Sequence, residues 1–208
     1  MRKKVKPNYS AFRRLKTKNK GDYMLSQEQK RELLKLARNT VEEFVTRGII
    51  PRYEAVDPLF KEKRGAFVTL HNKGKLRGCI GIIEGVQELF KTIIEMSIAS
   101  ATGDPRFGPV TAGEIKDIDI EISVLSLKKR AGSYTEIELG KHGVIVKRGS
   151  RSGVFLPQVA LETGWSLEVF MENLCESKAG LPKTAYKDRD TEIYVFDADV
   201  FGERGEFL

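Results

Sequence analysis

The segment from Asp117 to Leu127 alternates between polar and apolar side chains. Its apolar positions are Ile118, Ile120, Ile122 and Val124, and its polar positions are Asp117, Asp119, Glu121 and Ser123. Because successive side chains of a β-strand point to opposite faces of the sheet, this pattern predicts a strand with one buried and one solvated face. Such half-buried strands are typical of antiparallel sheets.

Other segments have the spacing of hairpins and of amphipathic helices. β-rich runs at 66–71 and 76–83 flank Asn-Lys-Gly-Lys, a second pair lies around 149–153, and 191–199 resembles a last strand. Helical spacing begins after the predicted capping residue Ser26, recurs at about 86–101, and recurs again after Ser166. Because the strands arrive as hairpins, the order predicts an α+β fold around an antiparallel or mixed sheet with flanking helices.

The chain divides into an arm, a domain and a tail. Residues 25–201 are predicted to form a single domain, and the sequence Lys-Lys-Arg-Ala-Gly-Ser at 128–133 predicts a linker inside it. The linker separates a larger lobe at about 25–127 from a second lobe at about 134–201, and the lobes can exchange elements. Residues 202–208 form a C-terminal tail.

The positive charge of the chain is concentrated in residues 1–24. This segment contains nine Lys or Arg residues against Asp22 alone, whereas the whole chain has a formal net charge of +7. The arm also lacks apolar periodicity, which predicts a flexible basic arm. Its role is left open between a solubilising tail and a contact with nucleic acid or acidic lipid.

Composition excludes several classes of function. No apolar run approaches the ~20 residues that span a bilayer, and no apolar stretch follows the basic start, so we expect a cytoplasmic protein without a membrane segment. With two cysteines and two histidines the chain has no pair at metal-ligand spacing. Neither a phosphate-binding glycine loop nor a dinucleotide fingerprint is present, so no cofactor is predicted.

The stretch Leu-Arg-Gly-Cys-Ile-Gly at 76–81 places a cysteine between two glycines in a predicted strand. Alternation puts Arg77 and Cys79 on one face, about 7 Å apart, with Gly81 leaving an open notch beside them. A guanidinium at that distance would stabilise a thiolate by roughly 2 kcal/mol and lower its pKa, which makes Cys79 a candidate nucleophile. The alternative is a small core residue flanked by glycines that allow a helix to pack closely.

Three further segments contain candidate site residues. In Asp-Pro-Arg-Phe, Asp104 and the following proline can present Arg106 as an anion-binding fork, or Arg106 can simply pair with Asp104. Gln158 follows a proline that blocks strand pairing, so its amide can point into a cleft, although a strand terminator explains it as well. His142 is a weak candidate for acid/base work, against a structural role in a turn.

Together the stretches at 76–81, 104–110, 142–146 and 152–159 resemble the AMMECR domain family, named after a human chromosomal region linked to Alport syndrome, midface hypoplasia and elliptocytosis. The resemblance covers about residues 25–201. It implies an α+β fold with two unequal lobes and a groove between them, where the shared segments meet. It also implies a connection to RNA modification and an association with Memo-type and radical SAM proteins.

The resemblance carries over to few residues. Those that match its motifs are Arg77, Gly78, Cys79, Gly81, Asp104, Pro105, Arg106, Phe107, Pro157 and Gln158. Gly108 stands where the family usually has a proline, and the basic arm lies outside the family core.

Two functions are weighed on these grounds, and whether the protein is an enzyme is left open. In the first, a cleft containing Cys79 acts in RNA or nucleotide modification, alone or with partner enzymes. An anionic substrate is bound there by Arg77 and Arg106, together with Gly78, Gly81, Asp104 and Gln158. In the second, the groove is a non-catalytic binding module or adaptor that docks a protein or an RNA segment.

Overall fold

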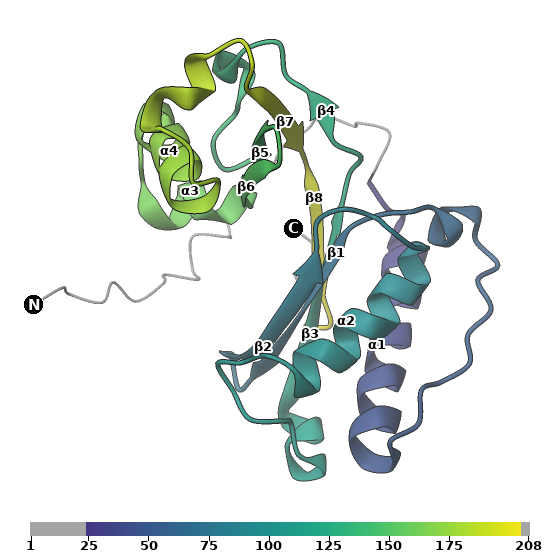
Figure 1. Ribbon diagram of the computed structural model, residues 1–208. Helices are drawn as coiled ribbons and strands as arrows, with labels where there is room; N and C mark the ends of the chain where they lie inside the picture. The colour runs from purple at the N-terminus through teal and green to yellow at the C-terminus, as the bar shows by residue number, and fades with distance from the viewer. Residues whose placement is uncertain (1–23, 205–208) are drawn as a thin grey trace, which may run out of the picture. The chain divides into compact units, whose positions relative to one another are not determined.

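The computed structural model describes residues 24–204, which form two compact units (Figure 1). The larger unit consists of residues 24–126 and 199–204, and the smaller unit of residues 127–198. The predicted basic arm, apart from Met24, lies outside the described residues, as does the end of the predicted tail. The last described residues thus belong to the larger unit, although they follow the smaller one in the chain.

The larger unit is a four-stranded sheet with two long helices. Its strands lie in the order β2-β1-β3-β8. In chain order the elements are α1 (Gln27–Arg47), the 3-10 helix η2 (Pro58–Lys61), β1 (Ala66–Asn72), β2 (Lys75–Ile82), α2 (Leu89–Thr102), the 3-10 helix η3 (Ala112–Asp117), β3 (Ile118–Leu125) and β8 (Ala198–Gly202).

The first hairpin has the predicted tight turn. Lys73 and Gly74 both have positive φ, at 51° and 77°, which allows a two-residue connection between β1 and β2. Glycine adopts this conformation without steric cost, so the Asn-Lys-Gly-Lys sequence determines the register of the pair. A shift between Leu70 and His71 is the one irregularity in that register.

Helix α1 begins and ends where the sequence indicates. The Ser26 hydroxyl accepts the Gln29 backbone N–H at 3.2 Å, and the Gln29 side chain accepts the Ser26 N–H at 2.8 Å. Gly48 ends the helix with φ at 67°. Both devices supply partners for backbone groups that a helix end leaves unpaired.

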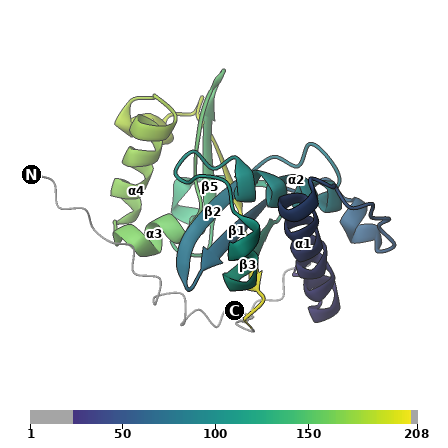
Figure 2. The same cartoon turned by 90° about the horizontal axis from the view of Figure 1, so that it is seen from below.

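Helices α1 and α2 cover the apolar face of the larger sheet (Figures 1 and 2). The isoleucines of β3 are buried as the alternation predicts, whereas Asp119, Glu121 and Ser123 are only partly buried. The shared core contains Leu33, Ala37, Val41, Val68, Leu70, Leu89, Ile93, Ile120 and Ile122.

The predicted last strand is two strands in two different sheets. β7 (Glu192–Phe196) belongs to the smaller unit, and β8 continues in the larger one, next to β3. The Glu203 backbone N–H donates to the Ile120 carbonyl at 3.1 Å, which extends this contact beyond β8. Alternation alone could not reveal the change of sheet, because it reports faces and not strand partners.

The smaller unit is a second antiparallel sheet with a helical layer. Its strands lie in the order β4-β7-β5-β6. Its elements are β4 (Lys129–Arg130), the 3-10 helix η4 (Tyr134–Glu136), β5 (Gly143–Arg148), β6 (Arg151–Phe155), α3 (Pro157–Thr163), α4 (Leu167–Asn173), the π-helical turn η5 (Leu174–Lys178), the 3-10 helix η6 (Lys183–Lys187) and β7.

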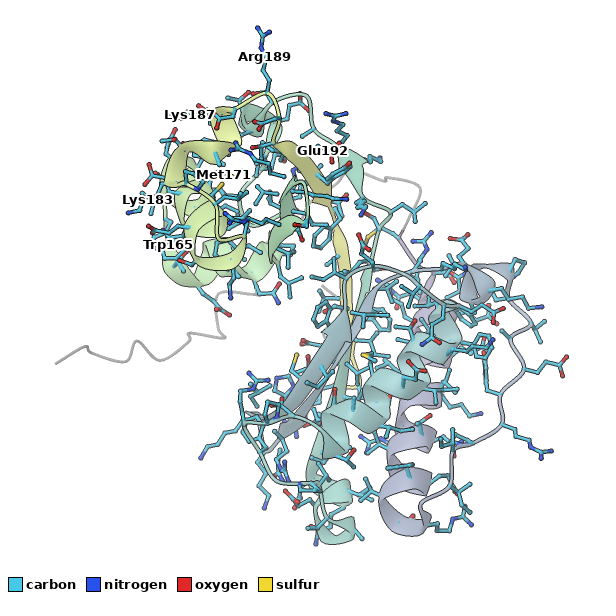
Figure 3. The ribbon with its side chains drawn as sticks, viewed as in Figure 1. Trp165, Met171, Lys183, Lys187, Arg189 and Glu192 are labelled. Carbon is cyan, nitrogen blue, oxygen red and sulfur yellow. The ribbon has the colours of Figure 1, made fainter. Side chains whose placement is uncertain are left out.

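Two details of this unit differ from the sequence prediction. The predicted linker at 128–133 contains the short strand β4, which pairs with β7. Pro157 does not merely terminate a strand: it is the first residue of α3, where a proline's missing N–H costs nothing. Met171 lies inside the helical layer, whereas Arg189 extends away from it (Figure 3).

The observed architecture confirms the predicted α+β fold class. In the part of the chain from residue 24 to residue 204, no helix is both long and apolar enough to cross a bilayer. Within the same range, no three His, Cys, Asp or Glu side chains gather in a way that could hold a metal ion.

Candidate functional site

Cys79 lies in β2, the edge strand of the larger sheet, on the face opposite the helices. Its register partner is Thr69 of β1, and Thr69 in turn faces Glu121 of β3. The Thr69 hydroxyl oxygen is 3.2 Å from the Cys79 sulfur. A thiol, a hydroxyl and a carboxyl therefore form one row across three strands.

The loop after α2 holds the backbone of Cys79 with a carboxylate and a guanidinium. Asp104 Oδ2 accepts the Cys79 N–H at 2.8 Å, and Arg106 Nη2 donates to the Cys79 carbonyl at 3.3 Å. Asp104 and Arg106 also pair directly, at 2.9 Å through Nε and 2.6 Å through Nη2. The loop thus supplies partners for the outer edge of β2, next to which no other described strand lies.

The two members of this pair differ in exposure. The Asp104 side chain is 2% exposed, whereas that of Arg106 is 54% exposed. Hydrogen bonds from Arg106, and then from the backbone of Cys79, hold the pKa of Asp104 well below its usual range. The buried Asp104 carboxylate thus holds Arg106 in place, and the Arg106 guanidinium reaches solvent close to Cys79.

Arg77 does not stand beside the thiol as predicted. Its Nε donates to Glu114 at 2.8 Å, and its two terminal nitrogens donate to the carbonyls of Gly108 and Pro109 at 2.9 and 3.1 Å. The same guanidinium is the main reason that the pKa of Glu114 falls to about 2. Arg77 therefore ties β2 to the loop and to η3. The alternation misleads here because Leu70 pairs with Gly78 whereas His71 pairs with Leu76, which leaves Arg77 as the extra residue of a bulge.

The expected open notch beside Cys79 is absent, because neighbouring atoms fill it. A Cβ at Gly81 would lie 2.2 Å from the Phe67 ring. A Cβ at Gly78 would lie 2.1 Å from the backbone oxygen of Ser100 in α2. Gly78 allows a helix to pack closely, as in the alternative interpretation of this stretch, whereas Gly81 makes room for a ring of the neighbouring strand.

Ser100 explains why α2 comes so close to the hairpin. Its hydroxyl accepts the Ile80 N–H at 2.9 Å and donates to the Val68 carbonyl at 2.6 Å. A 2%-exposed helix residue thus bridges β1 and β2. The sequence carried no signal for this contact, because serine inside a helix is ordinary.

The pKa of the Cys79 thiol is raised, contrary to the prediction that Arg77 lowers it. Burial is the largest cause, and the Thr69 hydroxyl and the Arg106 charge act in the opposite direction. Arg106 therefore has the electrostatic role that the sequence analysis assigned to Arg77.

Glu121 is a member of the row that sequence reasoning missed as a site residue. Burial raises the pKa of its carboxyl. Within residues 24–204 no hydrogen bond or ion pair to this carboxyl is found. The sequence placed Glu121 on the solvated face of the alternating strand. A carboxylate is expected there whether or not it belongs to a site, so its position alone did not identify it.

His142 and Gln158 belong to the smaller unit, whereas the other six predicted site residues belong to the larger one. His142 Nδ1 accepts the Glu138 N–H at 3.1 Å, and its Nε2 lies 3.9 Å from Asp197. Gln158 is half-buried in the first turn of α3. Cys175 lies fully buried in η5, and burial raises the pKa of its thiol as well.

Replacing Asp104 with asparagine is expected to lower the free energy of unfolding at pH 7 by about 1–2 kcal/mol, because charge-assisted hydrogen bonds to a buried acceptor are lost. A lowered pKa means that the native state binds this proton less tightly than the unfolded chain does. The stabilisation is therefore present at neutral pH and is lost as the pH falls below about 4, the range of the ordinary value of 3.8.

Urea unfolding at several pH values measures this difference. Asp117→Asn is the matched control, since Asp117 pairs at 3.5 Å with a lysine that is 73% exposed and should contribute almost nothing. An Asp104 variant as stable as the control at pH 7 would contradict the anchoring role.

The fold and the site together define a class: an α+β protein with two antiparallel sheets, in which a loop carboxylate and guanidinium hold a cysteine in an edge strand. The model of the AMMECR1 family matches residues 34–201, and the chain belongs to this family.

Relatives of known sequence or structure agree with this assignment. A protein of Methanothermobacter thermautotrophicus is 44% identical in an alignment of 188 residues that covers 87% of this chain and 97% of that protein. Protein MK0488 of Methanopyrus kandleri is 42% identical and covers 86% of this chain and 90% of its own. The crystal structure of the uncharacterized protein PH0010 from Pyrococcus horikoshii is similar with a TM-score of 0.75 and 36% identity, covering 88% of this chain and 94% of that chain.

Proposed function

We propose that this protein is a thiol-dependent enzyme that modifies an anionic substrate, RNA or a nucleotide, with Cys79 as nucleophile. The observation that carries the proposal is the arrangement of Arg106, which is anchored by a buried carboxylate at the backbone of Cys79 and is itself half exposed. A guanidinium held in this way binds phosphate oxygens with little loss of side-chain entropy.

The family resemblance supports the RNA or nucleotide substrate and the company of Memo-type and radical SAM proteins in the cytoplasm. His142 and Gln158 belong to the smaller unit and stay candidates for acid/base work and substrate contact respectively, and the proposal does not depend on them.

The raised pKa of Cys79 is the observation that favours the alternative, a binding module or adaptor. A thiol that stays protonated at neutral pH is a poor resting nucleophile. In that case the face around Cys79 docks an RNA or protein segment without bond formation.

Thiol modification separates the two functions. Cys79 should react with methyl methanethiosulfonate at least about tenfold faster than the fully buried Cys175, and faster still as the pH is raised toward 9, because its pKa is raised. Peptide mapping by mass spectrometry gives both rates. Equal, slow modification of both cysteines would favour the binding module.

The charge of the reagent tests Arg106. The anionic sulfonatoethyl methanethiosulfonate should be preferred over the methyl reagent, and Arg106→Gln should reduce this preference about fivefold, the equivalent of about 1 kcal/mol for a partly screened charge. Arg106→Lys keeps the charge and should keep most of the preference. Arg52→Gln, at an exposed arginine between α1 and η2, is the matched control.

A short single-stranded RNA of mixed sequence should slow the modification of Cys79 in the unaltered protein and much less in the Arg106→Gln variant. Protection that does not depend on Arg106 would rule out its role in binding the anion.

A further inference from the structure

Among residues 24–204, no group forms a hydrogen bond or an ion pair with the Glu121 carboxyl. Glu121 stands at one end of the row of side chains and Cys79 at the other. Thr69 lies between them and is 9% exposed. Directly opposite residues on neighbouring strands have Cβ atoms about 5 Å apart, so Thr69 separates Cys79 from Glu121 by about two strand spacings. The thiol and the carboxyl can therefore contact two ends of one small molecule.

The charged groups around Glu121 do not neutralise it. In the next row, Asp119 faces His71 and forms an ion pair with Arg204. On the other side, Gly202 of β8 lies next to the Glu121 backbone and contributes no side chain.

The remaining titratable groups gather near Cys79. Asp104 and Arg106 pair with each other there, and Arg106 lowers the pKa of the thiol while Glu121 and Asp104 raise it. Among the described residues, then, no cation or N–H donor is directed at the Glu121 carboxyl.

Partial burial takes water away from the Glu121 carboxylate, and the described residues give it no hydrogen bond or cation in return, which is unfavourable for the charged form. A ligand that brings N–H donors would remove this cost. Carboxylate side chains accept from ammonium groups and from the exocyclic amino group of cytosine in this way.

We infer that Glu121 binds an N–H donor group of the substrate, an ammonium or a nucleobase amino group, while Cys79 and Arg106 engage its electrophilic and anionic parts. The inference rests on the proposed function and names the substrate class: a molecule with an anionic group at one end and an amino group at the other. Glu121 is in this scheme a specificity-determining residue.

Matched methanethiosulfonates test the ammonium form. In each reaction the Cys79 thiolate attacks the sulfenyl sulfur, a disulfide forms, and methanesulfinate leaves, so only the charge of the transferred group differs. The rate of the cationic aminoethyl reagent relative to the methyl reagent should fall about fivefold in Glu121→Gln and stay nearly unchanged in Glu121→Asp. Because both reagents report the same thiolate, a change in the pKa of Cys79 cancels in the ratio.

Competing nucleotides test the amino form. Cytidine monophosphate should protect Cys79 better than uridine monophosphate, and Glu121→Leu, which removes the acceptor, should abolish the difference. Glu54→Gln and Glu54→Leu, at an exposed position between α1 and η2, are the controls for both assays.

A positive result in either assay supports the inference and identifies the source of the N–H group. If neither ratio depends on Glu121, the inference is wrong. Selective modification of Cys79 and the effect of Arg106 would persist in that case, so this failure is distinguishable from failure of the proposed function.

Discussion

Replacing Asp199 with alanine is expected to lower the free energy of unfolding by about 3–5 kcal/mol. Asp199 in β8 binds the Lys30 ammonium at 2.6 Å and accepts the Leu25 N–H at 2.8 Å. The Lys30 and Asp199 side chains are only 4% and 1% exposed. Without the carboxylate, a buried charge and a buried N–H lose their partner together.

The double variant Lys30→Met, Asp199→Leu is the decisive comparison. Apolar residues of similar size can replace a buried ion pair with little loss, so the double variant should be clearly more stable than Asp199→Ala alone. Urea denaturation of the three proteins measures this. The prediction fails if Asp199→Ala unfolds at the same denaturant concentration as the unaltered chain.

This ion pair also has a structural consequence. Lys30 lies in α1 near the start of the described chain, whereas Asp199 begins its last segment, so the pair ties together the two parts of the larger unit that the smaller unit separates in sequence. Loss of the pair should therefore loosen β8 first, which amide hydrogen exchange at residues 199–202 would detect.

Replacing Gly78 with alanine should destabilise the protein by at least about 3 kcal/mol, at the upper end of the range for overpacking a core. The added Cβ would meet the Ser100 backbone oxygen at 2.1 Å, and a backbone atom cannot move aside as the end of a flexible side chain can. Because Ser100 bridges β1 and β2, a shift of α2 would also disturb the strand that carries Cys79.

Gly108→Ala is the matched control for this substitution. A Cβ at Gly108 has no atom within 4 Å, so alanine should change the stability little or raise it slightly by restricting the unfolded chain. Thermal unfolding gives both values. Equal stability of the two variants would show that α2 yields easily and would contradict the close-packing role of Gly78.

The two arginines of the shared motifs have different tasks in this structure. Arg77 is 17% exposed and fully engaged by Glu114 and two carbonyls, so it orders the loop. Arg106 is 54% exposed and lies at the Cys79 backbone. The guanidinium of Arg77 lies 6.0 Å from the centre of the Phe107 ring and that of Arg106 lies 5.5 Å away, so one aromatic ring packs against both.

Local signals in the sequence were sufficient for most of the secondary structure. The capping residues of α1, the Lys73-Gly74 turn and the alternation in β3 each depend on neighbours a few residues away. Helix α3 was missed because its proline start was interpreted as the end of a strand. The change of sheet between β7 and β8 was missed because it depends on a partner about 80 residues earlier in the chain.

The candidate site was predicted in its residue types more than in its contacts. Cys79, Asp104 and Arg106 do lie together, since Asp104 accepts the Cys79 N–H and Arg106 donates to its carbonyl. The partner of Arg77, the packing against Gly78 and the position of Glu121 all required the tertiary structure.

By itself, the sequence determined the α+β class, the hairpins, the ends of α1 and the family, because steric preferences and side-chain periodicity act over a few residues. Only the tertiary structure decided that burial outweighs the nearby guanidinium at Cys79, and that Glu121 shares a row with it. Burial and strand register depend on segments far apart in the chain, and these two properties determine the charge state and the neighbours of a reactive group.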